Sequence, residues 1–481
     1  MWPRIANRRC ARLPLGSDLS IEGNVMPQNR SDFDGLPSAG PARPEDVIED
    51  LGDGLLLRRA RSEDIEANAA FQSVVQADPP DFEPFEHIAH WVRQLMDGSH
   101  PICRARDFLL VHDTRSDQVV SSLGLLSHTL AYDGIPVPTG MPELVGTHPD
   151  YRHRRLIARQ FAEVHRWSEE RGQLLQIIDG IPWYYRQFGY EMAAQNMGGL
   201  YQGRSLLPGE PVKGLGVRAA IEADAPFITR CFDHGMKRYR LTCRRDEAFW
   251  RFELSGRHGF STQTRFLKIV ETDSGEPRAV FNHVPILLDH GWTRTPMFEA
   301  APGVAWPEVV DAALFFLREV GAELASQSKQ EHAGAALVLG TEHPALEVLR
   351  GRGGRPRRPY AWYLRVADPV GFLKHVAPAL EARLVGSPYQ GHDGELALSF
   401  FRSGVRLHFE KGQLREIAEW RPSTEEVGDV SLPDLSFLNL LFGHRSLVEI
   451  ADAFPDCQIT RRQALVETLF PKQPSFLMPT S

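Results

Sequence analysis

Cysteine is scarce in this chain, because the 481 residues include five, all widely separated. Their odd number and spacing argue against a disulfide framework, and no CxxC or HxxxH pair is present to bind a metal. Positive charge is not in excess, since the net charge is −8, so the sequence shows no nucleic-acid-binding footprint. No apolar run approaches the roughly 20 residues that a membrane helix needs. These features predict a cytoplasmic protein with no metal site and with neither nucleic acid nor a membrane as partner.

What is present is the composition of a globular protein, with 42% hydrophobic and 24% charged residues. The length predicts more than one domain. Residues 1–53 are rich in Pro, Gly, Asp and Ser and have little periodicity, which predicts a disordered tail. This segment has no continuous apolar stretch of the kind found in a signal peptide. The sequence leaves open whether translation starts at Met1 or at Met26.

A short sequence pattern occurs twice in the chain, which predicts two units with the same fold; we call this repeated pattern the internal echo. The segments starting at Gly54 and Gly214 each have an apolar strand, an arginine, and an aspartate six residues later, followed by a helical pattern. We name residues 54–205 the first unit and residues 212–366 the second unit. The Pro- and Gly-containing segment 201–214 between the echoes is predicted to be a linker. In the second unit, segments 266–272 and 279–288 are strand-like, and a long helix is predicted from about Pro307 to Val320.

Residues 367–481, the third region, have a different pattern. Leu396, Leu398 and Phe400 alternate onto one face, and Val405, Leu407 and Phe409 do so again after an Arg-Ser-Gly turn. This predicts a β-hairpin with one buried face. Two helices broken at Gly443 are expected to follow.

The segment 142–192 carries the chemistry. It reads as a strand, an arginine-rich turn, an amphipathic helix, a second strand and the sequence Tyr-Arg-Gln-Phe-Gly-Tyr. A strand that feeds a helix through a basic turn offers free backbone N–H groups and a positive dipole end, which predicts a site for a phosphorylated ligand. The order of these parts resembles the GNAT acyl-CoA N-acetyltransferases.

This resemblance implies acetyl-CoA as co-substrate and assigns residues to it. Its pyrophosphate loop is matched by Arg152, His153, Arg154, Arg155, Leu156 and Ile157. Arg155 and Ile157 stand where the family usually has small residues. The strand segment that pairs with the pantetheine arm is matched by Val145, Gly146 and Thr147, and Gly146 also permits a bulge that separates two strands. Gly180 and Ile181 match positions that contact CoA.

The resemblance also suggests catalytic groups. Tyr185 matches the phenol that protonates the departing thiolate, with Tyr184 and Tyr190 as rivals. Glu143 lies where several members of the family place the carboxylate that deprotonates the amine. His148 and His128 are alternative bases that would act through water.

Two GNAT-like units followed by a sterol-carrier-like domain resemble, more closely, the enhanced intracellular survival family of N-acetyltransferases. In that family the terminal carboxylate, here that of Ser481, is the base, and the protein assembles as a homo-oligomer, a hexamer. The substrate cleft lies between the first two units, where acidic residues would attract a cation.

The resulting prediction is an α+β fold in four segments. A tail (1–53) precedes a catalytic GNAT domain (54–205) and a degenerate GNAT-like domain (212–366), both with mixed sheets, and a sterol-carrier-protein-like α/β domain (367–481) follows. The predicted activity is acetyl transfer from acetyl-CoA to a primary amine of an aminoglycoside, a polyamine or a lysine. The alternative is a binding or scaffold protein that has lost catalysis, which the unusual Arg155 favours.

Overall fold

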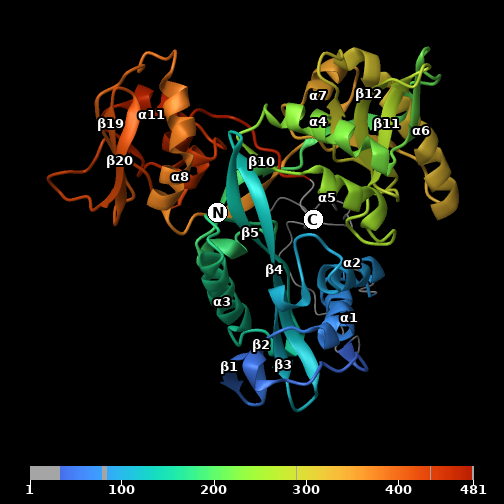
Figure 1. Ribbon diagram of the computed structural model, residues 1–481, viewed down its shortest axis with the longest axis horizontal. Coiled ribbons are helices and arrows are strands. Elements are labelled where there is room, and N and C mark those ends of the chain that lie inside the picture. Colours follow the sequence, from blue (N-terminus) through green and yellow to red (C-terminus); the bar gives the residue numbers. More distant parts are fainter. Residues whose placement is uncertain (1–32, 78–83, 289, 434, 479–481) are drawn as a thin grey trace, which may run out of the picture.

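The computed structural model describes residues 33–77, 84–288, 290–433 and 435–478. Figure 1 shows three groups of elements around the long hairpin formed by β4 and β5. In the described ranges, no helix has the length and apolar character needed to cross a membrane.

The largest sheet carries the first unit. Its strand order is β1-β2-β3-β4-β5-β6-β17-β7, and β10 pairs with the end of β4. The strands are β1 (Val47–Gly52), β2 (Leu55–Arg59), β3 (Phe108–Asp113), β4 (Gln118–Tyr132), β5 (Ile135–Thr147), β6 (Leu175–Ile178), β7 (Glu191–Asn196), β10 (Leu241–Cys243) and β17 (Tyr360–Arg365).

Helices cover both faces of this sheet. Helices α1 (Ile65–Val75) and α2 (Glu86–Met96) pack on one face and α3 (Leu156–Glu170) packs on the other. Successive residues of a strand point to opposite faces, so Leu110 joins the core beneath α1 and α2 while Leu109 joins the core beneath α3.

The N-terminal segment differs from its prediction. Residues 1–32 lie outside the described ranges, but residues 33–53 are ordered. Strand β1 pairs antiparallel with β2, and Ile48 and Leu51 pack against the core beneath α3. These two apolar side chains supply the burial that the composition of the tail did not suggest.

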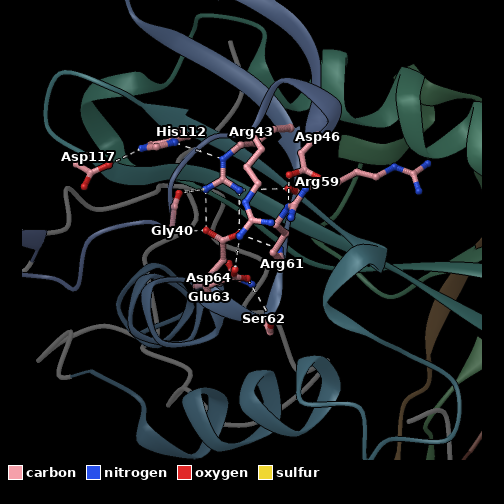
Figure 2. A network of polar contacts seen from close by, with 12 residues as sticks. Gly40, Arg43, Asp46, Arg59, Arg61, Ser62, Glu63, Asp64, His112 and Asp117 are labelled. Atoms are coloured by element: carbon pink, nitrogen blue, oxygen red, sulfur yellow. Dashed lines mark hydrogen bonds and ion pairs between the residues drawn. The ribbon is translucent and has the colours of Figure 1, made fainter.

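The arginine–aspartate pair of the internal echo forms in both units. In the first unit Arg58 donates to both carboxylate oxygens of Asp64, at 2.7 and 2.8 Å, and both side chains are buried. Figure 2 shows Asp64 within the surrounding network of polar contacts. In the second unit Arg218 donates to Asp224 at 2.6 and 2.8 Å, and the arginine side chain is 35% exposed. Each aspartate also accepts a backbone N–H from three residues earlier, at the start of α1 or of α4 (Ala225–Met236). The echo therefore marks a shared strand-to-helix structure.

The second unit contains two sheets, with the orders β14-β12-β11-β9 and β13-β15-β8-β16. Their strands are β8 (Gly199–Gly203), β9 (Leu215–Ala219), β11 (Phe266–Thr272), β12 (Pro277–His283), β13 (Trp292–Thr295), β14 (Phe298–Ala300), β15 (Gly334–Leu337) and β16 (Arg355–Arg357). The accompanying helices are α4, α5 (Glu247–Arg251), α6 (Trp306–Ser328) and α7 (Pro344–Leu349).

The two units exchange strands. Strand β8 belongs to the first unit by sequence but pairs with β15 and β16. In return, β17 leaves the second unit and lies between β6 and β7 in the first sheet. The predicted boundaries at 205, 212 and 366 therefore do not separate independent structures. The predicted linker 201–214 also begins inside a strand, since β8 extends to Gly203.

The third region forms the sheet β20-β19-β18-β21-β22, as the alternating pattern predicted for its first hairpin. Its strands are β18 (Gly394–Ser399), β19 (Gly404–Glu410), β20 (Gln413–Trp420), β21 (Val430–Ser431) and β22 (Gln458–Ile459). Its helices are α8 (Pro369–Leu384), α9 (Ser436–Leu441), α10 (Leu447–Ala453) and α11 (Gln463–Leu469). This region packs on the tip of the β4–β5 hairpin, where the Tyr132 hydroxyl donates to the carbonyl of Leu441 at 2.8 Å.

Candidate functional site

The site lies where strands β5 and β6 separate. These parallel strands pair at Thr139–Leu175 and Gly140–Gln176, and β5 then continues for seven residues without pairing to β6. The separation coincides with a bulge at Leu144, which has a left-handed backbone (φ 56°). Gln72 of α1 donates to the Leu144 carbonyl at 2.6 Å and holds this conformation. Val145, Gly146 and Thr147, which the resemblance assigned to pantetheine, lie on this part of β5, which pairs with β4 but not with β6.

The bulge does not depend on Gly146, in contrast to the expectation from sequence. A Cβ atom at Gly146 would lie 2.5 Å from a methyl group of Val75, so the glycine is required for close packing of α1. The left-handed residue is instead Leu144, for which such a conformation is uncommon.

The basic turn forms between β5 and α3, as predicted. His153 (φ 64°) and Arg155 (φ 58°) adopt the left-handed conformation, and the side chains of residues 153–155 are exposed. Their backbone N–H groups donate no hydrogen bond to any described residue. Leu156 and Ile157 follow as the first residues of α3, whose initial N–H groups have no acceptor within the helix. The turn thus presents amides and guanidinium groups suited to an anion.

Two arginines of the turn differ in their surroundings. Arg152 is half-buried, and burial lowers the pKa of its guanidinium. Arg154 is exposed and stacks on the ring of Tyr151 at 5.0 Å. The Arg155 side chain also points to solvent and therefore does not fill the turn.

Tyr185 is held in a short 3-10 turn, Tyr184–Phe188, after strand β6. Its side chain is buried, with the rings of Phe161 and Tyr363 at 5.7 and 5.5 Å. A Cβ atom at Gly180 would lie 2.0 Å from the Tyr185 ring, so only glycine allows this approach. Burial, followed by the nearby charge of Glu143, raises the pKa of Tyr185 well above its usual value. The phenol therefore stays protonated at neutral pH.

Glu143 lies on β5, directly before the bulge, and is half-buried. Burial raises the pKa of its carboxyl to about 7, and the Leu144 N–H, which it accepts at 3.1 Å, opposes this rise. The structure thus brings Glu143 near Tyr185, and a carboxyl with a pKa near 7 is suited to act as a general base.

The exchanged strand β17 contributes two tyrosines that the sequence analysis missed. Tyr363 accepts the backbone N–H of Trp183 at 2.6 Å and donates to the carbonyl of Ile181 at 3.3 Å. Tyr360 donates to the carbonyl of Gly180 at 3.0 Å. Two phenols from the second unit therefore hold residues 180–183, which lead directly into Tyr185. The sequence analysis assigned no element to residues 360–363, and their aromatic side chains give no indication of which strands they pair with.

The other candidates have different roles or positions. Tyr190 donates to the side chain of Gln176 at 2.9 Å and is buried. His148 accepts the Asp150 N–H at 3.1 Å and caps the turn before Arg152. His128 is buried, and burial together with Arg245 lowers the pKa of its imidazole well below the usual value. Ser481 lies outside the described residues.

Comparison with known proteins identifies a family domain in the part of the chain that forms this site. Residues 57–193 match the profile of the acetyltransferase (GNAT) domain family. A GCN5-related N-acetyltransferase from Anabaena variabilis aligns with a TM-score of 0.59 at 14% identity, over 88% of this chain and 99% of that one. A GCN5-related N-acetyltransferase from Kribbella flavida gives 0.57 at 16% identity, over 88% and 97%. Eis1 from Mycobacterium abscessus gives 0.53 at 12% identity, over 87% and 98%. No curated protein matches the chain.

These findings confirm the predicted fold class, since the mixed α/β architecture and several mixed sheets recur in GNAT-fold structures over most of the chain. They support an acyltransferase whose first unit has the GNAT fold and uses an acyl-CoA. The sterol-carrier-like character of the third region stays a prediction.

Proposed function

We propose that the chain transfers the acetyl group of acetyl-CoA to a primary amine. The observation that carries this proposal is that Glu143 lies close enough for its charge to raise the pKa of Tyr185, beside the point where β5 and β6 separate. The basic turn at the end of β5 would hold the pyrophosphate of the coenzyme, through the amides of residues 153–157 and the side chain of Arg152. The pantetheine arm would then lie along residues 145–147, facing Gly180 and Ile181.

The two side chains take complementary roles. Glu143 removes the proton of the amine, whose nitrogen attacks the thioester carbon. The tetrahedral intermediate then collapses, and the C–S bond breaks. Tyr185 donates a hydrogen bond to the leaving sulfur and supplies its proton as charge develops there. A phenol is a weaker acid than a thiol, by about 2 kcal/mol at their reference pKa values, so this transfer must be coupled to breakage of the C–S bond.

The carboxylate of Ser481 is a second candidate for the base. Residues before it run beside β10, where the N–H of Phe476 donates to the carbonyl of Leu241 at 2.9 Å. Adding one residue to the chain end tests this role, because unchanged turnover would remove Ser481 from the mechanism. The scaffold alternative is not favoured, because the side chain of Arg155 leaves the basic turn open.

A thiol-release assay with acetyl-CoA and a panel of amines tests the proposal. We expect wild-type protein to release CoA with at least one polyamine, aminoglycoside or lysine-type amine. Tyr185→Phe should slow this at least tenfold, or about 1.4 kcal/mol of barrier. Tyr184→Phe is the matched control, because its half-buried ring lies 5.2 Å from that of Tyr185. Equal rates for wild type and Tyr185→Phe would end the proposed role of Tyr185.

A further inference from the structure

Residues 33–46, which precede β1, are held against the first unit by hydrogen bonds, and we name them the strap. The N–H of Gly40 donates to the carboxylate of Asp64 at 2.9 Å, and the Gly40 carbonyl accepts from Arg58 at 2.9 Å. Figure 2 shows Gly40 and Asp64 in this network. Because the side chains of Arg58 and Asp64 are both 1% exposed, the strap is anchored to the interior of the first unit rather than to its surface.

Phe33, at the start of the strap, lies beside the residue that joins β5 to the basic turn. Its side chain is 3% exposed. The centre of its ring lies 4.1 Å from that of His148, which directly follows β5, and 6.2 Å from that of Phe71 on α1. One buried ring of the strap therefore contacts both α1 and the residue from which the basic turn departs.

His148 extends this contact into the basic turn. Its Nδ1 atom accepts the N–H of Asp150 at 3.1 Å, and its ring meets the ring of Tyr151 edge-on at 5.3 Å. The Tyr151 hydroxyl donates to the carboxylate of Asp113 at 2.6 Å, and the guanidinium of Arg154 lies over the Tyr151 ring at 5.0 Å. A continuous series of contacts thus joins Phe33 to an arginine of the basic turn.

The conformation of the basic turn requires support of this kind. His153 and Arg155 are both left-handed, with φ of 64° and 58°, in a region that residues with a Cβ atom seldom occupy. Such conformations persist where the surrounding structure fixes them. A site built from backbone N–H groups also binds more tightly when those groups are ordered before the ligand arrives.

We propose that Phe33 is a positioning residue, through which the strap holds the basic turn in the shape that binds the diphosphate of the coenzyme. Phe33 acts through His148 and does not itself contact the coenzyme. The inference rests on the proposed function in one respect, namely that the basic turn binds the pyrophosphate. It adds a segment outside the matched family domain, residues 57–193, to the coenzyme site.

Calorimetric titration of the full chain with CoA, without an acceptor, tests the inference. We expect Phe33→Ala to lower the affinity for CoA at least fivefold. Phe33→Leu keeps a large apolar side chain against His148 and should lose less than twofold. Arg43→Gln is the matched control, because it removes an exposed ion pair between the strap and Glu63 and should leave the affinity unchanged. Equal affinities for wild type and Phe33→Ala would overturn the inference.

A double-mutant cycle with His148→Ala separates this role from a contribution to folding alone. If Phe33 acts through His148, Phe33→Ala should lower the affinity less than twofold in a chain that already carries His148→Ala. Independent, multiplying losses would overturn the inference. His148→Ala also decides the case if Phe33→Ala does not fold, because unchanged CoA affinity in His148→Ala would show that the series of contacts has no effect on binding.

The wild-type titration distinguishes failure of the inference from failure of the proposed function. Wild-type protein that does not bind CoA would overturn the coenzyme site and, with it, the role of the strap. Normal binding by wild type together with unchanged binding by the Phe33 and His148 variants would overturn the role of the strap alone.

Discussion

Burial raises the pKa of both Glu143 and Tyr185, and the same shift suits the different role that we propose for each side chain. It raises the pKa of Glu143, the proposed base, to about 7, near neutral pH, and it raises the pKa of Tyr185, the proposed acid, which keeps the phenol protonated. The same desolvation therefore prepares both groups. Neither effect was visible in the sequence, where Glu143 could equally have been an exposed residue at the start of a strand.

The pH dependence of turnover follows from Glu143. We expect kcat/KM to rise about tenfold per pH unit below pH 7 and to level off above it, because the carboxylate form is the active one. Steady-state rates between pH 5 and pH 9 provide the measurement. A flat profile across this range would contradict Glu143 as the base.

Stability should respond to the same residue. A carboxyl whose pKa rises on folding stabilises the native state below its unfolded pKa, and that contribution disappears as the pH rises through about 7. Glu143→Gln should therefore raise the free energy of unfolding at pH 8 by about 1 kcal/mol, a value reduced for solvent screening of a half-buried group. At pH 4 the variant and wild type should unfold alike in urea, and a gain of equal size at both pH values would exclude titration as its cause.

At the scale of elements, the repeated arginine–aspartate pair offers a matched comparison. Asp64→Asn leaves Arg58 buried and unpaired, which should cost about 3 kcal/mol. Asp224→Asn should cost about 1 kcal/mol, because Arg218 is partly exposed and also pairs with Glu271 at 2.8 Å. Urea denaturation measures both, and equal losses would show that burial does not distinguish the two pairs.

Strand β17 acts on the site through Tyr363. Removing its hydroxyl leaves the N–H of Trp183 without its partner and loosens the turn that carries Tyr185. We expect Tyr363→Phe to lower kcat at least threefold while KM for acetyl-CoA changes little, and to cost about 1–2 kcal/mol of stability. Tyr360→Phe loses the hydrogen bond to the Gly180 carbonyl but leaves the N–H of Trp183 paired with Tyr363, so it should have the smaller effect. A KM effect alone would indicate a role in binding instead.

Helices, strands and turns could be predicted from the sequence where the local order of apolar, polar and basic residues determines the structure. Leu396, Leu398 and Leu407 are buried on the one face of the hairpin that the alternating pattern predicted. The basic turn lies directly before α3, where the sequence predicted it. The partner of β17 could not be predicted, because its residues 361–364 are all buried and such an apolar run fits the centre of either sheet. The bulge at Leu144 was hidden as well, since leucine carries no signal for a left-handed backbone.

At the scale of the whole molecule, the exchanged strands make the first two units one structure. A fragment of residues 54–205 lacks β17, so β6 and β7 would expose unpaired edges. We expect this fragment to aggregate. In contrast, full-length protein cut within residues 207–213 should stay associated on size-exclusion chromatography, because each half holds a strand of the other. Separation of the halves under native conditions would contradict this reading.

The exchange also bears on synthesis. Ribosomes release the chain from its N-terminus, and the strand that completes the first sheet ends at Arg365, roughly three quarters of the way along the sequence. Until that segment emerges, the nascent chain has no means of closing the sheet around Tyr185. Coenzyme binding is thereby deferred to a late stage of translation, and a polypeptide truncated by a premature stop codon before residue 360 would be inert and a target for proteolysis.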